Sequence, residues 1–218
     1  MDLMNRDQVE RERMVRVQIA GHGIHNQDVL SAMRKVPRHF FVPSGAREYA
    51  YVDSPVRIGN GQTISQPYIV ALMTELLDVR SSHKVLDVGT GSGYQAAILG
   101  ELAGEVHSIE RHAELAKRAA DQLKALEYRN VYVHIGDGTL GYMPESPYDR
   151  ILVAAAAPYV PEPLLSQLRI HGRLILPVGS RYSQQLEVWE RLGEETYDKK
   201  VNIPVVFVPL IGEAGWEE

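Results

Sequence analysis

The segment that most constrains the fold is KVLDVGTGSGYQAA, residues 84–97. Its apolar run, residues 85–88, predicts a buried strand, and the glycine-rich turn after it leads into an Ala-rich stretch typical of a helix. Strand, glycine turn and helix in this order open a nucleotide-binding α/β unit, because a backbone without side chains can approach a ligand closely. The segment therefore predicts a ligand site at the end of this strand.

From residue 84 onward, strand-like and helix-like segments alternate. Strands are predicted at residues 84–88, 105–110, 131–135, 150–156 and 172–178, and helices at residues 94–102, 112–126 and 161–170. This alternation is typical of a doubly wound, mostly parallel sheet. Two more strand-like runs, residues 185–192 and 203–209, have no helix between them and predict an antiparallel pair at the sheet edge. We expect a seven-stranded α/β fold with antiparallel C-terminal strands.

The first 80 residues differ from this pattern and predict a helical and loop extension. Residues 3–20 are helix-like, Asn26 is a candidate cap of a second helix that ends at Pro37, and Pro67 begins a third helix. Residues 37–67 lack periodicity, and a loop of this length in a compact protein is more often functional than accidental. We expect one domain, residues 1–218, in which residues 1–80 cover the active site and residues 81–218 bind the ligand.

Composition and charge exclude several classes of protein. The net charge of -5 disfavours a broad nucleic-acid-binding face, and the absence of cysteine excludes disulfides and thiolate metal sites. The eight histidines form no pair at metal-ligand spacing, so no metal site is predicted. The charged N-terminus lacks the apolar core of a signal peptide, and no apolar run approaches the length of a membrane span. We expect a cytoplasmic protein without membrane or nucleic-acid partners.

The spacing of the glycines indicates which ligand binds. A dinucleotide fingerprint needs glycine at the first, third and sixth positions, but Tyr94 occupies the sixth position here. The GxGxG pattern after an acidic strand end instead resembles class I S-adenosylmethionine-dependent methyltransferases. A glycine turn that binds no ligand is the alternative. The resemblance implies S-adenosylmethionine as methyl donor, S-adenosylhomocysteine as product, and a donor site that includes Asp87, Gly89, Thr90, Gly91, Ser92 and Gly93.

Acidic residues after the next two strands extend this donor site. Glu110 ends the second strand, 21 residues after Gly89, where a carboxylate can accept hydrogen bonds from both ribose hydroxyls. Asp137 and Gly138 follow the third strand, where an Asp can bind the adenine amino group. The structural alternatives are that Glu110 only begins a helix and that Asp-Gly is only a turn.

Five segments together resemble one family closely, the protein-L-isoaspartate O-methyltransferases. They are PRHFFVP near residue 40, YVDSPVRIGNGQTISQPYIVALM, VLDVGTGSGYQAAIL, and the late LILPVG and FVPL segments. The resemblance implies methyl transfer to the α-carboxyl of L-isoaspartyl residues in damaged proteins and peptides, whose esters cyclise to a succinimide and so begin repair. GQTISQP is much more specific to this family than the glycine turn.

The resemblance also implies an acceptor site. Ser65 of the TIS motif is the candidate catalytic residue, and the predicted substrate-binding residues are Thr63, Ile64, Ser65 and Gln184. The alternative for Ser65 is a helix cap, because Pro67 follows it and Thr63-x-x-Gln66 resembles a capping box. The family often has Thr after FVPL, whereas this chain has Ile211, which places the contribution of that hydroxyl in doubt.

The chemistry of a carboxylate acceptor agrees with these residues. A carboxylate is already ionised at neutral pH, so the transfer needs no general base, and the four alanines at 154–157 offer no group to activate an amine. Catalysis should then come mainly from alignment of the reactants and exclusion of water. A methyltransferase for a small molecule or RNA is an alternative that GQTISQP and the acidic pI disfavour, and a protein that binds the nucleoside without catalysis is a third.

Overall fold

Seven strands form one mixed sheet in the computed structural model, which describes residues 3–218, with side chains from Arg6 onward. The strands are β3 (Lys84–Val88), β4 (Glu105–Glu110), β5 (Val131–Ile135), β6 (Tyr148–Val153), β7 (Leu168–Gly179), β8 (Gln184–Arg191) and β9 (Tyr197–Val205). Their order is β5-β4-β3-β6-β7-β8-β9, parallel from β5 to β7 and antiparallel from β7 to β9. The predicted mostly parallel seven-stranded sheet with antiparallel C-terminal strands is confirmed.

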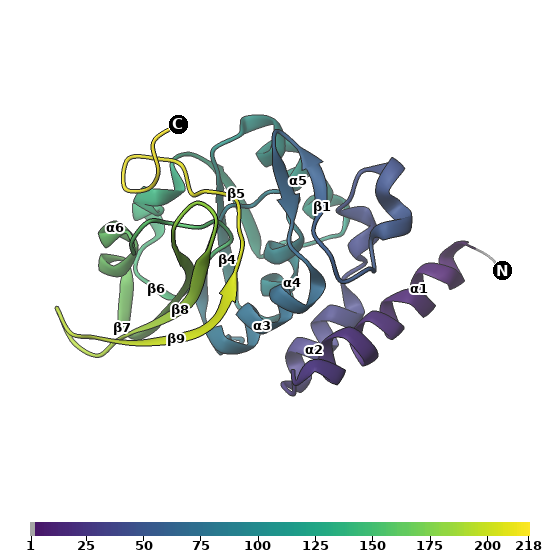
Figure 1. The fold of residues 1–218 in the computed structure, drawn as a ribbon, viewed down its shortest axis with the longest axis horizontal. Helices are drawn as coiled ribbons and strands as arrows, with labels where there is room; N and C mark the ends of the chain where they lie inside the picture. Colours follow the sequence, from purple (N-terminus) through teal and green to yellow (C-terminus); the bar gives the residue numbers. More distant parts are fainter. Residues whose placement is uncertain (1–2) are drawn as a thin grey trace.

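The strand order creates a crevice in the middle of the sheet. The chain runs outward from β3 through β4 to β5, then returns to β6 on the other side of β3. The connections after β3 and β6 therefore leave in opposite directions, and ligands of open α/β sheets bind at such a switch point, beyond the carboxyl ends of the strands. Figure 1 shows β8 and β9 on the side of the molecule opposite helices α1 and α2.

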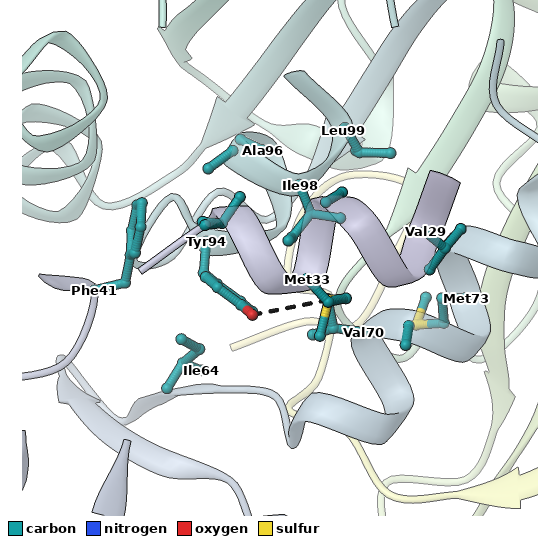
Figure 2. Close-up of a cluster of buried hydrophobic side chains, with 14 of the residues drawn as sticks. Val29, Met33, Phe41, Ile64, Val70, Met73, Tyr94, Ala96, Ile98 and Leu99 are labelled. Carbon is teal, nitrogen blue, oxygen red and sulfur yellow. Dashed lines mark hydrogen bonds between the residues drawn. The ribbon is translucent and has the colours of Figure 1, made fainter. Parts of the chain in front are cut away.

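Helices cover both faces of the sheet because side chains alternate along each strand. Val85 belongs to one hydrophobic cluster with α3 (Pro67–Leu77), α4 (Tyr94–Leu102) and α5 (Ala113–Ala125), whereas Leu86 belongs to a second cluster with α6 (Glu162–Ser166). Figure 2 shows part of the first cluster, where the ring of Tyr94 extends from the start of α4 toward Met33. Two short 3₁₀ turns, η5 (Gly138–Leu140) and η6 (Met143–Glu145), precede β6.

The N-terminal extension begins with α1 (Leu3–Arg13), which continues as a π-helical turn, η1 (Met14–Ile19), and a 3₁₀ turn, η2 (Ala20–His22). The predicted continuous helix over residues 3–20 thus changes hydrogen-bond pattern after Arg13. The predicted cap of α2 (Gln27–Lys35) is confirmed, because the Asn26 side chain accepts hydrogen bonds from the Asp28 and Val29 amides. Within residues 3–218, no helix is both long enough and apolar enough to cross a bilayer.

Residues 37–67 contain more regular structure than the sequence suggested. They form two 3₁₀ turns, η3 (Arg38–Phe40) and η4 (Ser44–Tyr49), and a hairpin of β1 (Val56–Gly59) and β2 (Gln62–Ile64). The Asn60-Gly61 pair at its turn was the available signal, since this dipeptide favours two-residue hairpin turns. Arg118 of α5 fixes the hairpin by donating a hydrogen bond to the Ile58 carbonyl oxygen at 3.2 Å.

One predicted helix is wrong in its second half. The helix expected at 161–170 is α6, which ends at Ser166, and β7 begins at Leu168 instead of residue 172. Gln167 causes the change. Its carbonyl oxygen accepts a hydrogen bond from the Tyr148 amide at the start of β6, and its buried side chain donates to the Leu140 carbonyl oxygen. These tertiary bonds draw the chain into the sheet earlier than its local pattern indicates.

Two predicted strands have shifted boundaries. The strand expected at 150–156 is β6, which spans 148–153. The strand expected at 203–209 is β9, which spans 197–205, and its first half is polar because it forms the outer edge of the sheet. After Val205 the chain leaves the edge and crosses the crevice, where the amide of Ala156 donates to the Val208 carbonyl oxygen and the amide of Leu210 donates to the Ala156 carbonyl oxygen.

Candidate functional site

A pocket opens at the switch point of the sheet. The space between its lining atoms is about 990 Å³, a figure that includes solvent at the open mouth. Its walls come from the carboxyl ends of β3, β4 and β6, from β2 of the hairpin, and from residues 208–211 of the segment that crosses the crevice. Segments that are distant in the sequence therefore meet around one cavity.

The glycine turn forms the floor of the pocket. Gly89 and Gly91 line it with positive φ values of 93° and 53°, which most other residues adopt only with strain. Thr90 and Ser92 also line it. Gly93 has a different role, because a side chain there would lie 3.2 Å from Ala119 of α5, and Gly93 is not part of the lining. The predicted donor contacts of the first four residues agree with their placement, and Gly93 allows α4 and α5 to pack closely.

Glu110 presents a buried carboxylate at the pocket wall. One oxygen accepts a hydrogen bond from the Gly91 amide, and the other accepts from the His112 amide, both at 2.9 Å. These bonds fix the carboxylate against the glycine turn and leave each oxygen able to accept another. The alternative that Glu110 only begins α5 does not account for its bond to Gly91. A carboxylate held in this way suits a ligand that offers two neighbouring hydroxyls.

Asp87 lies beneath the floor and does not line the pocket. It is fully buried, and one of its oxygens accepts a hydrogen bond from Ser108 Oγ at 2.7 Å. Its other oxygen has no partner among residues 3–218. The Ser108 hydroxyl is also 2.6 Å from Thr90 Oγ1, so Asp87 supports the floor through Ser108. A direct donor contact by Asp87 stays a prediction.

Burial raises the pKa of Asp87 to about 7, although the Ser108 hydrogen bond opposes the shift. The unfolded pKa is 3.8, so the folded state binds the proton more tightly. The protonated carboxyl therefore stabilises the fold at low pH, and this contribution is lost as pH rises from about 4 to about 7, at about 1.4 kcal/mol per pH unit.

Asp87→Asn should remove this dependence. The free energy of unfolding of the wild type should fall relative to the variant between about pH 5 and pH 7, measured by urea titration at both values. The amide keeps an oxygen for Ser108, so the difference reports the ionisation. Parallel pH profiles for the two proteins would contradict the raised pKa.

Asp137 and Gly138 occupy different places. Gly138 lines the pocket, packed against Val88 of β3. The Asp137 carboxylate lies outside the lining, and its oxygens accept hydrogen bonds from the Thr139 amide and hydroxyl and from the Glu213 amide. Asp137 thus fastens the C-terminal segment that supplies Leu210 and Ile211 to the wall. The adenine contact expected of Asp137 stays a prediction.

The hairpin strand β2 supplies the opposite wall. Gln62, Thr63, Ile64 and Ser65 all line the pocket, so the predicted substrate residues of this motif are brought together. A second hollow, formed partly by Phe207, shares Thr63, Ser65, Ala154 and Val208 with the first. Ser65 is therefore one of four residues that line both hollows.

The start of α3 shows that Ser65 is not a helix cap. The N-cap residue is Gln66, which makes no side-chain cap, and Asp53 of the preceding loop accepts a hydrogen bond from the Tyr68 amide at 2.9 Å. The capping box suggested by Thr63 and Gln66 is thus wrong, and Asp53 supplies the side-chain bond at the start of α3 instead. Among residues 3–218, no group hydrogen-bonds to the Ser65 hydroxyl, which is half-buried and available to a ligand.

A buried arginine that sequence reasoning missed holds Ser65 from behind. The Arg38 guanidinium donates to the Ser65 carbonyl oxygen at 2.7 Å and to the Ala50 carbonyl oxygen at 2.8 Å. It also lies over the Tyr94 ring, 4.8 Å from its centre. Burial lowers the pKa of Arg38 to about 10, and within residues 3–218 no carboxylate forms an ion pair with it. Its position within PRHFFVP was the available signal.

Gln184 does not line either hollow, which differs from the predicted substrate contact. It is buried at the start of β8, where its side-chain oxygen accepts from the Phe207 amide and its side-chain nitrogen donates to the Ser180 carbonyl oxygen. Both the oxygen and the nitrogen of the Gln184 side-chain amide are therefore bonded to backbone groups. The structure shows that Gln184 supports Phe207, and a direct contact with a substrate stays a prediction.

The rest of the wall is mainly apolar. Ala154 and Ala155 directly follow β6, although the sequence predicted them within the strand, and Ile211, which stands where the resemblance led us to expect Thr, also lines the pocket. Arg111 and His112 also line it and were missed, although they directly follow Glu110. Among the described side chains, one group is close enough to hold a metal, formed by Glu105, His107 and Glu145, and none of these three lines the pocket.

Comparison with known proteins identifies relatives over nearly the whole chain. Residues 9–215 match the family model described as Protein-L-isoaspartate(D-aspartate) O-methyltransferase (PCMT). A protein-L-isoaspartate O-methyltransferase of Syntrophus aciditrophicus (strain SB) is 53% identical over 216 residues, which cover 98% of this chain and 99% of that protein.

Two solved structures are similar in fold. A protein-L-isoaspartate O-methyltransferase superposes with a TM-score of 0.84 at 27% identity, covering 94% of this chain and 67% of that chain. One from Plasmodium falciparum in complex with S-adenosyl-L-homocysteine superposes with a TM-score of 0.80 at 26% identity, covering 92% and 98%.

Proposed function

Because this chain belongs to the protein-L-isoaspartate O-methyltransferase family, we propose that the pocket at the switch point is its active site, with Ser65 between donor and acceptor. The chain transfers a methyl group from S-adenosylmethionine to the α-carboxyl of L-isoaspartyl residues, which begins repair through a succinimide. The observation that supports the assignment is that Ser65 lines both hollows and its hydroxyl has no hydrogen-bond partner among residues 3–218, with one hollow floored by the glycine turn and one lined by Phe207.

The donor side fits a nucleoside with a ribose diol. Gly89 and Gly91 bring the backbone to the floor without side chains, and the Glu110 oxygens each have capacity for one more hydrogen bond. S-adenosylmethionine, when bound, supplies the methyl group from a positively charged sulfur. We assign donor binding to Gly89, Thr90, Gly91, Ser92, Glu110 and Gly138, with Asp87 and Asp137 supporting them from behind.

The acceptor side needs alignment more than proton transfer. The acceptor carboxylate is ionised at neutral pH, so no base must act on it. The Ser65 hydroxyl can donate to one carboxylate oxygen and leave the other free to face the donor. Ala154 and Ala155 add no competing polar group, and apolar walls strengthen a hydrogen bond to a charge by excluding water. Thr63 and Ile64 complete the wall.

A pair of peptides tests the function. We expect labelled methyl from S-adenosylmethionine to enter a short L-isoaspartyl peptide and not its L-aspartyl twin of the same sequence. The twins share composition and net charge, so only the position of the α-carboxyl differs. Equal labelling of both peptides, or of neither, would contradict the proposal, and labelling of RNA in place of the peptide would favour the RNA alternative. Isoaspartyl proteins as natural partners and a cytoplasmic location remain parts of this proposal.

The buried arginine gives a further prediction for the acceptor side. In Arg38→Lys, a single ammonium group replaces the planar guanidinium and cannot bond to the Ser65 and Ala50 carbonyl oxygens in the same geometry. Ser65 should therefore shift. We expect kcat on the isoaspartyl peptide to fall about tenfold, since a misplacement of about 1 Å can cost aligned reactants about a hundredfold.

Arg150→Lys is the matched control. Arg150 is also buried and also donates to backbone carbonyl oxygens, those of Asp78 and Asp149, but it does not line the pocket. Both variants should lose stability in thermal unfolding, and only Arg38→Lys should lose kcat. Equal losses of kcat in the two variants would mean that Arg38 acts only through general stability.

A further inference from the structure

The tip of the β1-β2 hairpin carries a dipeptide with its own chemistry. Asn60 and Gly61 form the turn with φ values of 50° and 72°, both positive, as a type I′ turn requires. Both residues are exposed. The hairpin leads directly into the acceptor wall, because β2 begins at Gln62 and ends one residue before Ser65. A chemical change at Asn60 would therefore act on the wall.

Asparagine followed by glycine is the sequence in which the backbone most readily attacks a side chain. The nitrogen of the following residue bonds to the side-chain amide carbon, ammonia leaves, and a succinimide ring forms. Water then opens the ring. When it adds to the carbonyl carbon of the original main chain, the product is isoaspartate, with the chain continuing through the side-chain carbon and the former main-chain carboxyl left free. The balance is one asparagine and one water giving one isoaspartate and one ammonia.

The surroundings of Asn60 leave this attack open. A side chain built on Gly61 would meet no atom within 4 Å, so neighbouring residues do not cover the Gly61 backbone. Because glycine has no side chain, nothing at residue 61 hinders the attack of its own nitrogen. The hydrogen bond found at Asn60 is to its carbonyl oxygen, from the Gln62 side chain at 3.3 Å. Within residues 3–218, neither the Asn60 side-chain amide nor the Gly61 amide has a hydrogen-bond partner.

The chain contains an internal contrast. Near the pocket, the chain has one other Asp or Asn followed by glycine, the pair Asp137-Gly138. The Asp137 carboxylate accepts three hydrogen bonds, and Gly138 packs tightly on Val88. These contacts keep the Asp137 carboxyl carbon away from the Gly138 nitrogen. The remaining asparagines precede larger residues, which hinder the attacking nitrogen: Asn5, Asn26, Asn130 and Asn202.

We propose that Asn60 is a self-modification site: it converts to isoaspartate, and a second copy of the enzyme methylates the product. Transfer within one molecule does not fit, because β2 is extended at about 3.3 Å per residue and keeps residue 60 on the order of 10 Å from Ser65. The methylation step rests on the proposed function, whereas formation of isoaspartate does not depend on it.

Isoaspartate at position 60 should damage the acceptor wall more than the donor floor. It adds one methylene group to the main chain and one negative charge at the turn. The pairs Arg57 with Thr63 and Val56 with Ile64 hold β2 in register, and a longer turn disturbs both. Glu110 anchors the glycine turn from β4 through the Gly91 amide, whereas the hairpin touches that turn through Ile58, so donor affinity should fall less than peptide turnover.

Ageing the full-length protein at mildly alkaline pH tests the proposal. Peptide mapping should find isoaspartate at position 60 forming at least about tenfold faster than at any other asparagine or at Asp137, because only Gly61 follows without a hindering side chain or a rigid contact. Fresh enzyme with labelled S-adenosylmethionine should then label aged protein at residue 60. Labelling should rise with the concentration of fresh enzyme, as transfer between molecules requires.

Asn60→Gly is the matched variant, because glycine adopts the positive φ of the turn and has no side-chain amide that could form a succinimide. It should keep the initial peptide turnover, resist the loss of turnover on ageing, and take no label at position 60. Absence of isoaspartate at residue 60 in aged wild-type protein would overturn the proposal, and so would isoaspartate that stays unlabelled by enzyme able to methylate the peptide. If fresh enzyme fails to methylate the isoaspartyl peptide, the proposed function is contradicted. Peptide mapping of the aged protein would still show whether Asn60 converts to isoaspartate.

Discussion

Replacing Ser65 with alanine should lower kcat/KM on an isoaspartyl peptide by about tenfold to a hundredfold. Ser65 lines both hollows and its hydroxyl caps no helix, so its removal should take away the proposed hydrogen bond to the acceptor carboxylate. Hydrogen bonds to charged groups contribute about 1.5–3 kcal/mol, which corresponds to this range. The change in melting temperature should be small, because Asp53 supplies the bond to the start of α3.

Steady-state kinetics with the isoaspartyl peptide, together with thermal unfolding, measures this effect. Ser166→Ala is a suitable control, because Ser166 is exposed at the end of α6, where its hydroxyl bonds to the Pro163 carbonyl oxygen. Both variants lose one hydroxyl, and only Ser65→Ala should lose turnover. A lower melting temperature with unchanged turnover would assign Ser65 a structural role.

Replacing Glu110 with alanine should raise the dissociation constant of the methyl donor by about a hundredfold or more. Two hydrogen bonds from ribose hydroxyls to a carboxylate would be lost, each worth about 1.5–3 kcal/mol. The glycine turn would also lose its anchor, since the Gly91 amide donates to this carboxylate. Calorimetric titration with S-adenosylhomocysteine measures the affinity without turnover.

Two further variants sharpen this result. Glu110→Gln keeps the shape but turns an amide group toward either the Gly91 or the His112 N–H, so its affinity should lie between those of the wild type and the alanine variant. Glu114→Ala removes an exposed carboxylate from the first turn of α5, the helix that follows β4, and should leave affinity unchanged. An unchanged dissociation constant for Glu110→Ala would exclude the ribose assignment.

The parallel sheet was predictable because strand-like and helix-like segments alternate along this part of the sequence. β3 and β4 begin and end where the sequence indicated, since all their stabilising contacts favour the same local pattern. The polar first half of β9 and the early start of β7 were not predictable in this way. They depend on pairing at the sheet edge and on the bonds of Gln167, which no local pattern records.

The functional site divides along the same line. Glu110 and the glycine turn were predictable because the ends of adjacent parallel strands necessarily meet. Arg38 was not, because its function depends on bonds to residues 12 and 27 positions away. The same holds for Gln184 and Asp137, which the sequence suggested as ligand contacts. In the fold, their side chains accept hydrogen bonds from the backbone amides of Phe207 and Glu213.

The crossing segment that supplies Leu210 and Ile211 has a consequence for folding kinetics. These residues close a wall whose opposite side begins at Gln62, about 150 positions earlier, and contacts of such long sequence separation form late because loop closure costs entropy. A chain that has already paired β3, β4 and β6 therefore still lacks a finished donor pocket. We therefore expect donor affinity to require the complete fold, so that a bound donor stabilises the folded chain as a whole.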